Sequence, residues 1–213
     1  MSAKEPTFFR LVATLAVTGL LSGLVLVCIY LVTQPMILRN QAEAMRRAIY
    51  KVLPGAERIS TFVIEGDGLA QFEPVGDEMP AGDAVFAGRK DDGRLVGYAI
   101  PAEGAGFMDT VRLIFGYDPS RRAIIGMQVL DSKETPGLGD KIIFDEVFHR
   151  NFVELKVEPE IVGVKRGEKV NPNEVDTITG ATISSNAVIS ILNEGSERWL
   201  PLIETHEGGE VEQ

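Results

Sequence analysis

A long uncharged stretch near the N-terminus is the feature that most limits what this chain can fold into. From Leu11 to Leu38 the sequence has no Asp, Glu, Lys or Arg. As a helix, Leu11–Val32 would be roughly 33 Å long at about 1.5 Å per residue, which matches a hydrocarbon core of about 30 Å. A cleaved signal peptide would have an apolar region of only about 7 to 15 residues, followed by a small-residue cleavage site. We therefore predict a retained transmembrane helix over residues 11–33, after a short segment over residues 1–10.

Small residues within this span and charged residues beside it bear on its packing and its orientation in the membrane. Gly19, Ser22 and Gly23 would let a second membrane helix approach closely. Basic residues lie on both sides of the span, so the positive-inside rule does not fix its orientation.

The composition excludes several classes of protein. The 213-residue chain has 21 Lys and Arg against 31 Asp and Glu, a net charge of −10. This balance argues against a nucleic-acid binder, because affinity for phosphates depends on cations. The single cysteine, Cys28, rules out an intramolecular disulfide framework and a multi-cysteine metal site. With only two histidines a His-rich centre is also implausible, so no metal is expected.

The chain after the span is predicted to form a stalk helix and one α+β domain. Apolar residues at helical spacing before Pro54–Gly55 predict a stalk over residues 34–55. Apolar runs separated by Gly, Asp and Pro turns predict a mixed or antiparallel sheet within a domain over residues 56–205. The predicted strands are Thr61–Ile64, Ala84–Gly88, Leu95–Ile100, Val111–Tyr117, Ala123–Leu130, Ile161–Val164 and Val175–Ile178.

Helices are expected after the main run of strands. Asp145–Phe152 is predicted as a short helix, and a final amphipathic helix follows the last strand. Trp199 is expected just past that helix as a packing residue. The acidic tail over residues 206–213 is expected to fray.

The segment Asp176–Ser185 combines a strand end, a small-residue turn and a helix start. Such a turn gathers free backbone N–H groups at the positive end of the helix dipole, where a phosphate is well placed. Gly180 and Ala181 permit close approach of a ligand. The hydroxyls that can donate or accept hydrogen bonds belong to Thr179, Thr182, Ser184 and Ser185. From these residues alone, a plain Ser/Thr helix cap remains the alternative interpretation.

Two motifs, in this order, resemble those of a known family. Glu134–Lys141 resembles the signature loop of the G subunit of Rnf-type ion-translocating oxidoreductases. Asp176–Thr182 resembles the flavinylation motif Asp-x-x-Ser/Thr-Gly-Ala-Thr of FMN-binding domains. The C subunit of the sodium-translocating NADH:quinone reductase represents a related family and is the nearer alternative. A non-redox, membrane-anchored scaffold is the alternative from a different class.

The resemblance implies a covalently bound FMN. In the family a dedicated flavin transferase joins the last threonine of the motif, through its hydroxyl, to the FMN phosphate, and the matching residue is Thr182. Asp176 would help the transferase recognise the acceptor, or would cap a turn. In the loop that contains Glu134, the backbone at Gly137 would approach the flavin and Leu138 would pack on its ring.

In the same loop the side chain of Thr135 or that of Lys141 would hydrogen-bond the ring carbonyls. The alternative for the whole loop is a stiff structural turn.

The resemblance further implies an electron-relay subunit of a membrane complex. The complex would couple electron transfer between reduced ferredoxin and NAD to the movement of sodium ions or protons. No catalytic residue and no stand-alone catalysis are expected, because FMN supplies the redox chemistry and the chain has no nucleotide-binding GxGxxG. The implied partners are the other subunits, a flavin transferase and membrane lipid. The implied location is the bacterial cytoplasmic membrane, with residues 1–10 inside and the FMN domain outside the cytoplasm.

Overall fold

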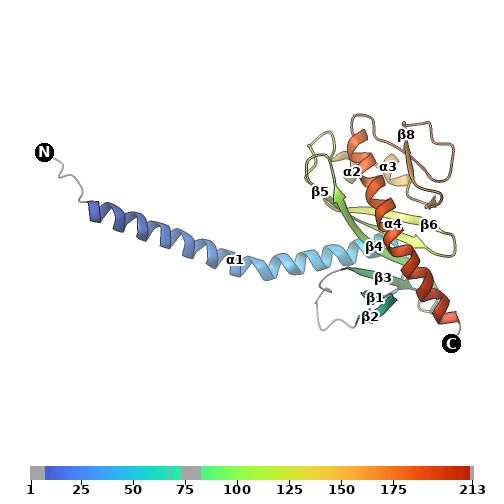
Figure 1. Cartoon of the computed structure of the whole chain (residues 1–213), viewed down its shortest axis with the longest axis horizontal. Helices are drawn as coiled ribbons and strands as arrows, with labels where there is room; N and C mark the ends of the chain where they lie inside the picture. The colour runs from blue at the N-terminus through green and yellow to red at the C-terminus, as the bar shows by residue number, and fades with distance from the viewer. Residues whose placement is uncertain (1–7, 67, 73–82, 212–213) are drawn as a thin grey trace. The chain divides into compact units, whose positions relative to one another are not determined.

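A long helix, an antiparallel sheet and a second long helix account for most of the structure (Figure 1). The computed structural model describes residues 8–66, 68–72 and 83–211, and the chain divides into two units, Met1–Glu43 and Ala44–Gln213. The helices are α1 (Phe8–Val52), α2 (Lys141–Phe144), α3 (Glu146–Arg150) and α4 (Thr182–Val211). The strands are β1 (Arg58–Glu65), β2 (Gly68–Phe72), β3 (Ala84–Arg89), β4 (Leu95–Ala105), β5 (Thr110–Asp118), β6 (Ala123–Asp131), β7 (Leu155–Lys156), β8 (Val162–Val164) and β9 (Glu174–Asp176).

The first unit consists of the apolar part of α1. All side chains from Phe8 to Val32 are exposed, although most are apolar, a distribution that suits lipid better than water. Within the described residues, α1 is the one helix long and apolar enough to cross a membrane. The prediction of a long apolar helix near the N-terminus is confirmed. The helix continues without interruption from the predicted span into the predicted stalk.

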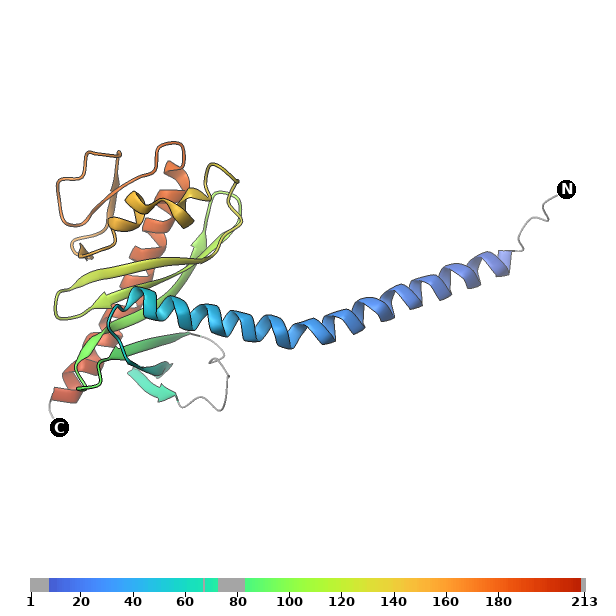
Figure 2. The same ribbon diagram turned by 180° about the vertical axis from the view of Figure 1, so that it is seen from behind.

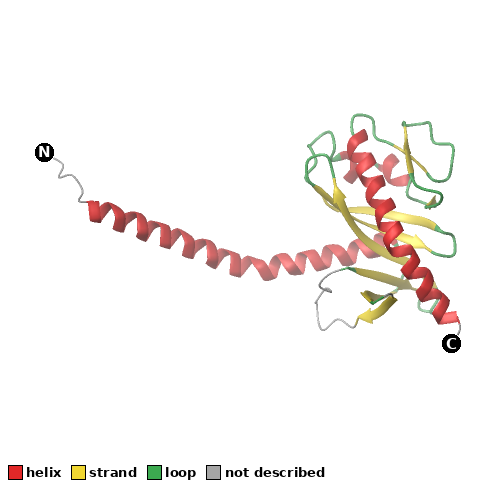
Figure 3. Ribbon diagram, viewed as in Figure 1, coloured by secondary structure: helices red, strands yellow, loops and turns green. Residues whose placement is uncertain are grey.

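The second unit is built on a seven-stranded sheet with the order β2-β1-β3-β4-β5-β6-β7. Every pairing in this sheet is antiparallel, whereas β8 and β9 form a separate parallel pair. Figure 3 distinguishes the strands from the helices by colour. The predicted α+β class is therefore confirmed. The sequence did not reveal β2 and β7, which have five and two residues at the two edges of the sheet.

The two faces of the sheet bury different helices. Because side chains alternate along a strand, Ile100 and Phe115 point into a core shared with α4, whereas Ala99 and Ile114 point into a core shared with the end of α1. Residues Ala48 to Leu53 supply the helical side of that second core. Figure 2 shows the last turns of α1 against the sheet.

Two local predictions need correction. The helix predicted over Asp145–Phe152 is α3, which is shorter (Glu146–Arg150) because Asp145 has an extended backbone (φ −70°, ψ 104°) as its N-cap. The preceding short helix α2 was not predicted. The final helix is longer than expected. Trp199 lies inside α4 and is 2% exposed, so its packing role is right and its place past the helix is wrong.

Residues 206–211, expected to begin an acidic tail, belong to α4 as well. The sheet holds this end of the helix. The Tyr98 hydroxyl donates to the Glu207 carboxylate, and the rings of Phe62 and His206 meet edge to face at 4.8 Å. Residues 212–213 lie outside the described residues.

Candidate functional site

The turn between β9 and α4 is closed by a backbone hydrogen bond and is open to solvent at Gly180. Gly180 has φ +82°, a left-handed conformation that glycine adopts without strain, and open space surrounds the position that a Cβ would occupy. The Ala181 N–H donates to the Ile178 carbonyl at 2.9 Å and closes the turn. The turn therefore leaves an open backbone surface immediately before the helix.

Ser185 fixes this turn to the helix from the inside. Its side chain is fully buried, and its hydroxyl accepts the Ile178 N–H at 3.1 Å while donating to the Ala181 carbonyl at 2.9 Å. The hydroxyl predicted as a ligand group is thus directed into the protein and holds the turn in shape.

Thr182 is the first residue of α4, and its side chain is exposed, as is that of Thr179. The first turn of a helix has N–H groups without intrahelical acceptors, and the dipole adds about half a positive charge at that end. Thr182 therefore presents a hydroxyl to solvent beside backbone donors that can stabilise an anion.

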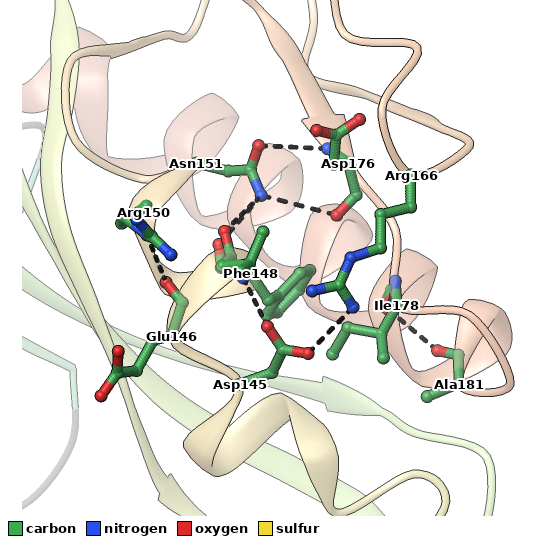
Figure 4. A network of polar contacts seen from close by, with 11 residues as sticks. Asp145, Glu146, Phe148, Arg150, Asn151, Arg166, Asp176, Ile178 and Ala181 are labelled. Atoms are coloured by element: carbon green, nitrogen blue, oxygen red, sulfur yellow. Dashed lines mark hydrogen bonds and ion pairs between the residues drawn. The ribbon is translucent and has the colours of Figure 1, made fainter.

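Asp176 is engaged by the connection between β8 and β9. Its carboxylate accepts the Gly167 N–H at 2.9 Å and the Lys169 N–H at 3.3 Å. Its own backbone N–H donates to the Asn151 side chain at 3.2 Å (Figure 4). These contacts support the turn-capping interpretation of Asp176 at this position.

An ion pair ties α3 to the same connection. The Asp145 carboxylate accepts the Phe148 N–H at 2.9 Å as the N-cap of α3 and lies 3.1 Å from the Arg166 guanidinium (Figure 4). Partial burial acts to raise the pKa of the Asp145 carboxyl. The Phe148 N–H and Arg166 act in the opposite direction, so that the pKa lies below its ordinary value.

Glu134 joins three segments of the chain. It is 5% exposed, and its Oε1 accepts the backbone N–H groups of Phe107 at 2.7 Å and Met108 at 3.1 Å. Its Oε2 accepts the Ser184 hydroxyl at 2.6 Å. The carboxylate thus links the β4–β5 hairpin, its own loop and the first turn of α4. Both Glu134 and Ser184 are buried in this arrangement and do not face solvent.

The remaining predicted loop residues lie on the outside of this junction. The Thr135 carbonyl accepts the N–H groups of Leu138 at 3.1 Å and Asp140 at 3.4 Å. Gly137 takes the left-handed φ of +78° that the turn requires. Leu138 is 52% exposed, and Lys141 is half-buried at the start of α2.

Comparison with known proteins identifies the family. A model of the FMN-binding domain matches residues 106–197. The G subunit of the ion-translocating oxidoreductase complex of Methanosarcina acetivorans is 32% identical over 196 residues, which cover 90% of this chain and 93% of that protein. This chain belongs to the family of G subunits of ion-translocating oxidoreductase complexes. The G subunit of the proton-translocating ferredoxin:NAD(+) oxidoreductase complex of Clostridium ljungdahlii is 24% identical, over 91% of this chain and 92% of its own length.

Two solved structures share the fold of this G-subunit family member. The C subunit of the Na(+)-translocating NADH-quinone reductase from Parabacteroides distasonis has a TM-score of 0.61 at 20% identity, over 78% of this chain and 93% of its own. NqrC of Shewanella oneidensis has a TM-score of 0.60 at 14% identity, over 78% and 99% of the two chains. The predicted family and its FMN-binding domain are confirmed, and the individual ligand residues stay predictions.

The FMN-binding match contains four exposed apolar residues around the Glu134 junction, of which the motifs did not indicate Phe107 and Met108. They are Phe107 (59% exposed), Met108 (63%), Leu138 (52%) and Ile183 (62%). Phe107 and Met108 donate their backbone N–H groups to Glu134. Leu138 and Ile183 are next in sequence to Gly139 and Ser184, which both lie against the Glu134 carboxylate. An apolar Phe-Met pair in the turn between two predicted strands was the available signal. We call these four residues the apolar rim.

Among the residues that the structure describes, no cluster of three or more His, Cys, Asp or Glu side chains is arranged to hold a metal ion.

Proposed function

We propose that this chain is the electron-relay subunit of an Rnf-type ferredoxin:NAD oxidoreductase complex and carries FMN through a phosphoester to the Thr182 hydroxyl. The observation that carries the proposal is the exposed threonine at the first position of α4, within the matched FMN-binding domain. Thr179 is exposed in the same turn but precedes the helix. Among the motif hydroxyls, those of Ser184 and Ser185 are buried in internal hydrogen bonds.

The turn suits the charge that the linkage would bring. A phosphate monoester carries about −1.5 to −2 at pH 7, and esterification to Thr182 leaves a diester with a single charge. The free N–H groups of the first turn of α4 and the helix dipole stabilise that charge. Gly180 leaves the approach to the phosphate open, because no side chain occupies the space beside it.

The apolar rim suits the flavin ring. Isoalloxazine is a flat ring system with a large apolar surface, and Leu138 and Ile183 are exposed apolar residues next in sequence to Gly139 and Ser184, which lie close together. Thr135 and Lys141 lie in the loop that carries Leu138, where a hydroxyl and an ammonium group would serve the ring carbonyls. FMN would supply one- and two-electron transfer, and the protein would supply its position and electrostatics.

The family and the apolar helix α1 support the proposed partners and location. The names of relatives specify ferredoxin:NAD(+) oxidoreductase complexes, one described as proton-translocating and another as Na(+)-translocating, so the proposal leaves the ion open. The other subunits of such a complex, membrane lipid around α1 and a flavin transferase are the proposed partners. The FMN domain is proposed to lie on the extracytoplasmic side.

Mass spectrometry of the full chain tests the linkage. The protein is produced in membranes with an active flavin transferase and denatured before its intact mass is measured. We expect an added mass of one FMN less one water, mapped to the peptide that contains Thr182. Thr182→Ala should lack this mass and in-gel flavin fluorescence, whereas Ser190→Ala, at an exposed position further along α4, should retain both.

The relay role is tested separately in the assembled complex. Thr182→Ala should assemble with the other subunits and fail to transfer electrons from reduced ferredoxin to NAD. Normal electron transfer by an assembled Thr182→Ala complex would overturn the relay role. An unmodified wild-type chain, alongside a control substrate that the transferase does modify, would favour the scaffold alternative.

A further inference from the structure

Glu134 is the feature of the site whose structural position differs most from its predicted role. The family resemblance groups it with flavin-contacting residues, yet its side chain is 5% exposed. Both of its oxygens are occupied, by two backbone N–H groups of the β4–β5 hairpin and by the Ser184 hydroxyl. A buried carboxylate that accepts three hydrogen bonds has little capacity left for an external ligand.

We propose that Glu134 is a positioning residue: it fixes the apolar rim to the start of α4 and so shapes the surface that binds the flavin ring, without touching the flavin. This inference rests on the proposed function. The contacts explain how one side chain does this. Phe107 and Met108 belong to the rim and donate to Glu134 directly, and Ser184 lies two residues after Thr182.

The backbone around Glu134 is shaped to admit the carboxylate. A Cβ added to Gly106 would lie 2.5 Å from Oε1 of Glu134, and one added to Gly139 would lie 2.4 Å from Oε2 and 2.7 Å from the Ser184 hydroxyl. Two glycines from two segments therefore leave room for this one group. Three donors converge on it, and an ionised carboxylate accepts from all three without a proton of its own.

Three variants of the full chain, modified with FMN in membranes, test the role. In Glu134→Ala the hairpin and the helix lose their common acceptor. In Glu134→Gln the amide oxygen accepts from Phe107 and Met108, and the NH2 group donates to the Ser184 oxygen. The matched control is Glu103→Ala, which removes an exposed carboxylate from β4.

The measurement is quenching of the attached flavin's fluorescence by iodide, which reports how well the ring is covered. We expect a severalfold larger quenching constant in Glu134→Ala, and wild-type values in Glu134→Gln and Glu103→Ala. A wild-type constant in folded Glu134→Ala would overturn the proposal. An equal rise of the quenching constant in Glu134→Gln and Glu134→Ala would overturn it too, because the charge of Glu134 and not its hydrogen bonds would then cover the ring.

Hydrogen exchange tests the junction without any flavin. In a Thr182→Ala background, Glu134→Ala should speed exchange of the Phe107 and Met108 amides by about tenfold or more, because both N–H groups lose their buried acceptor. Unchanged exchange of these amides would overturn the proposal. Absence of flavin from the wild-type protein would instead defeat the proposed function alone, because the exchange measurement needs no flavin.

If Glu134→Ala does not fold, Ser184→Ala replaces it. This variant removes the helix link alone, so the two hairpin amides should stay protected while iodide quenching rises. Wild-type quenching in Ser184→Ala would then overturn the proposal.

Discussion

The carbonyl oxygen of Val52 rests against Gly116: a Cβ built on Gly116 would lie 2.2 Å from that oxygen. Gly126, the register partner of Gly116 on β6, would place a Cβ 3.1 Å from the same oxygen. The end of α1 thus lies directly on the backbone of two neighbouring strands, with no side chain between them. Glycine is required here for close approach and not for an unusual backbone angle.

Gly116→Ala should therefore destabilise the protein. Overpacking a filled interior typically costs about 1–3 kcal/mol, and the obstructing atom belongs to the backbone, which cannot rotate aside. Gly68→Ala is the control, because nothing lies within 4 Å of its Cβ position, and its effect should stay within about 0.5 kcal/mol. Urea unfolding of the full chain in detergent, followed by the fluorescence of buried Trp199, measures both. Equal midpoints for the two variants would contradict the close contact.

Ser185→Ala should loosen the turn that precedes Thr182. The Ile178 N–H loses its acceptor, which costs about 1–3 kcal/mol for a buried group. Ser190→Ala, at an exposed position of the same helix, should change stability little. Under the proposed function, the fraction of chains carrying FMN should also fall in Ser185→Ala. Wild-type stability in Ser185→Ala would show that the hydroxyl does not hold the turn.

Acid should weaken the structure around α3 through Asp145. Because the pKa of this carboxyl is lower in the folded protein, its contribution to stability is complete above the ordinary aspartate pKa of about 3.9 and is lost as pH falls through the folded-state pKa. Asp145→Asn keeps an N-cap oxygen but loses the charge, so its stability should depend less on pH in this acid range. Asp145→Ala should lose about 1 kcal/mol at neutral pH with the cap. Unfolding midpoints compared between about pH 3 and about pH 7 give the answer, and parallel curves for wild type and Asp145→Asn would argue against the assignment.

The proposed orientation is open to chemical labelling. Cys28 is the only cysteine of the chain, so Cys28→Ser gives a background into which single cysteines can be placed. Ser190→Cys, exposed on α4, should react with a membrane-impermeant maleimide on intact cells. Ser2→Cys should react only after the membrane is opened. The reverse pattern would put the domain in the cytoplasm.

The parts of the fold that follow from local patterns could be predicted. The uncharged block indicated α1, and alternating apolar runs between turn residues indicated the central strands. Each of these patterns is carried by residues that are close together in the sequence. Helix α2 could not be predicted, because its four residues are too few to show a helical spacing of apolar side chains. The length of α4 was missed because contacts from β1 and β4 hold its end.

The site was located from sequence but not resolved into roles. Thr182, Ser184 and Ser185 lie close in sequence, yet successive helical residues point in different directions, so one hydroxyl faces solvent and two are buried. The junction at Glu134 joins residues 26, 27 and 50 positions away. Only the folded chain brings these donors together, and no spacing within the loop predicts them.

The exposure of Thr182 in the folded domain also bears on the order of maturation. The Thr182 side chain is exposed, and the buried Ser185 hydroxyl holds the turn that precedes it by accepting the Ile178 N–H. Under the proposed function, a transferase could therefore act on a chain that has already folded. FMN attachment would then require no unfolding at the start of α4.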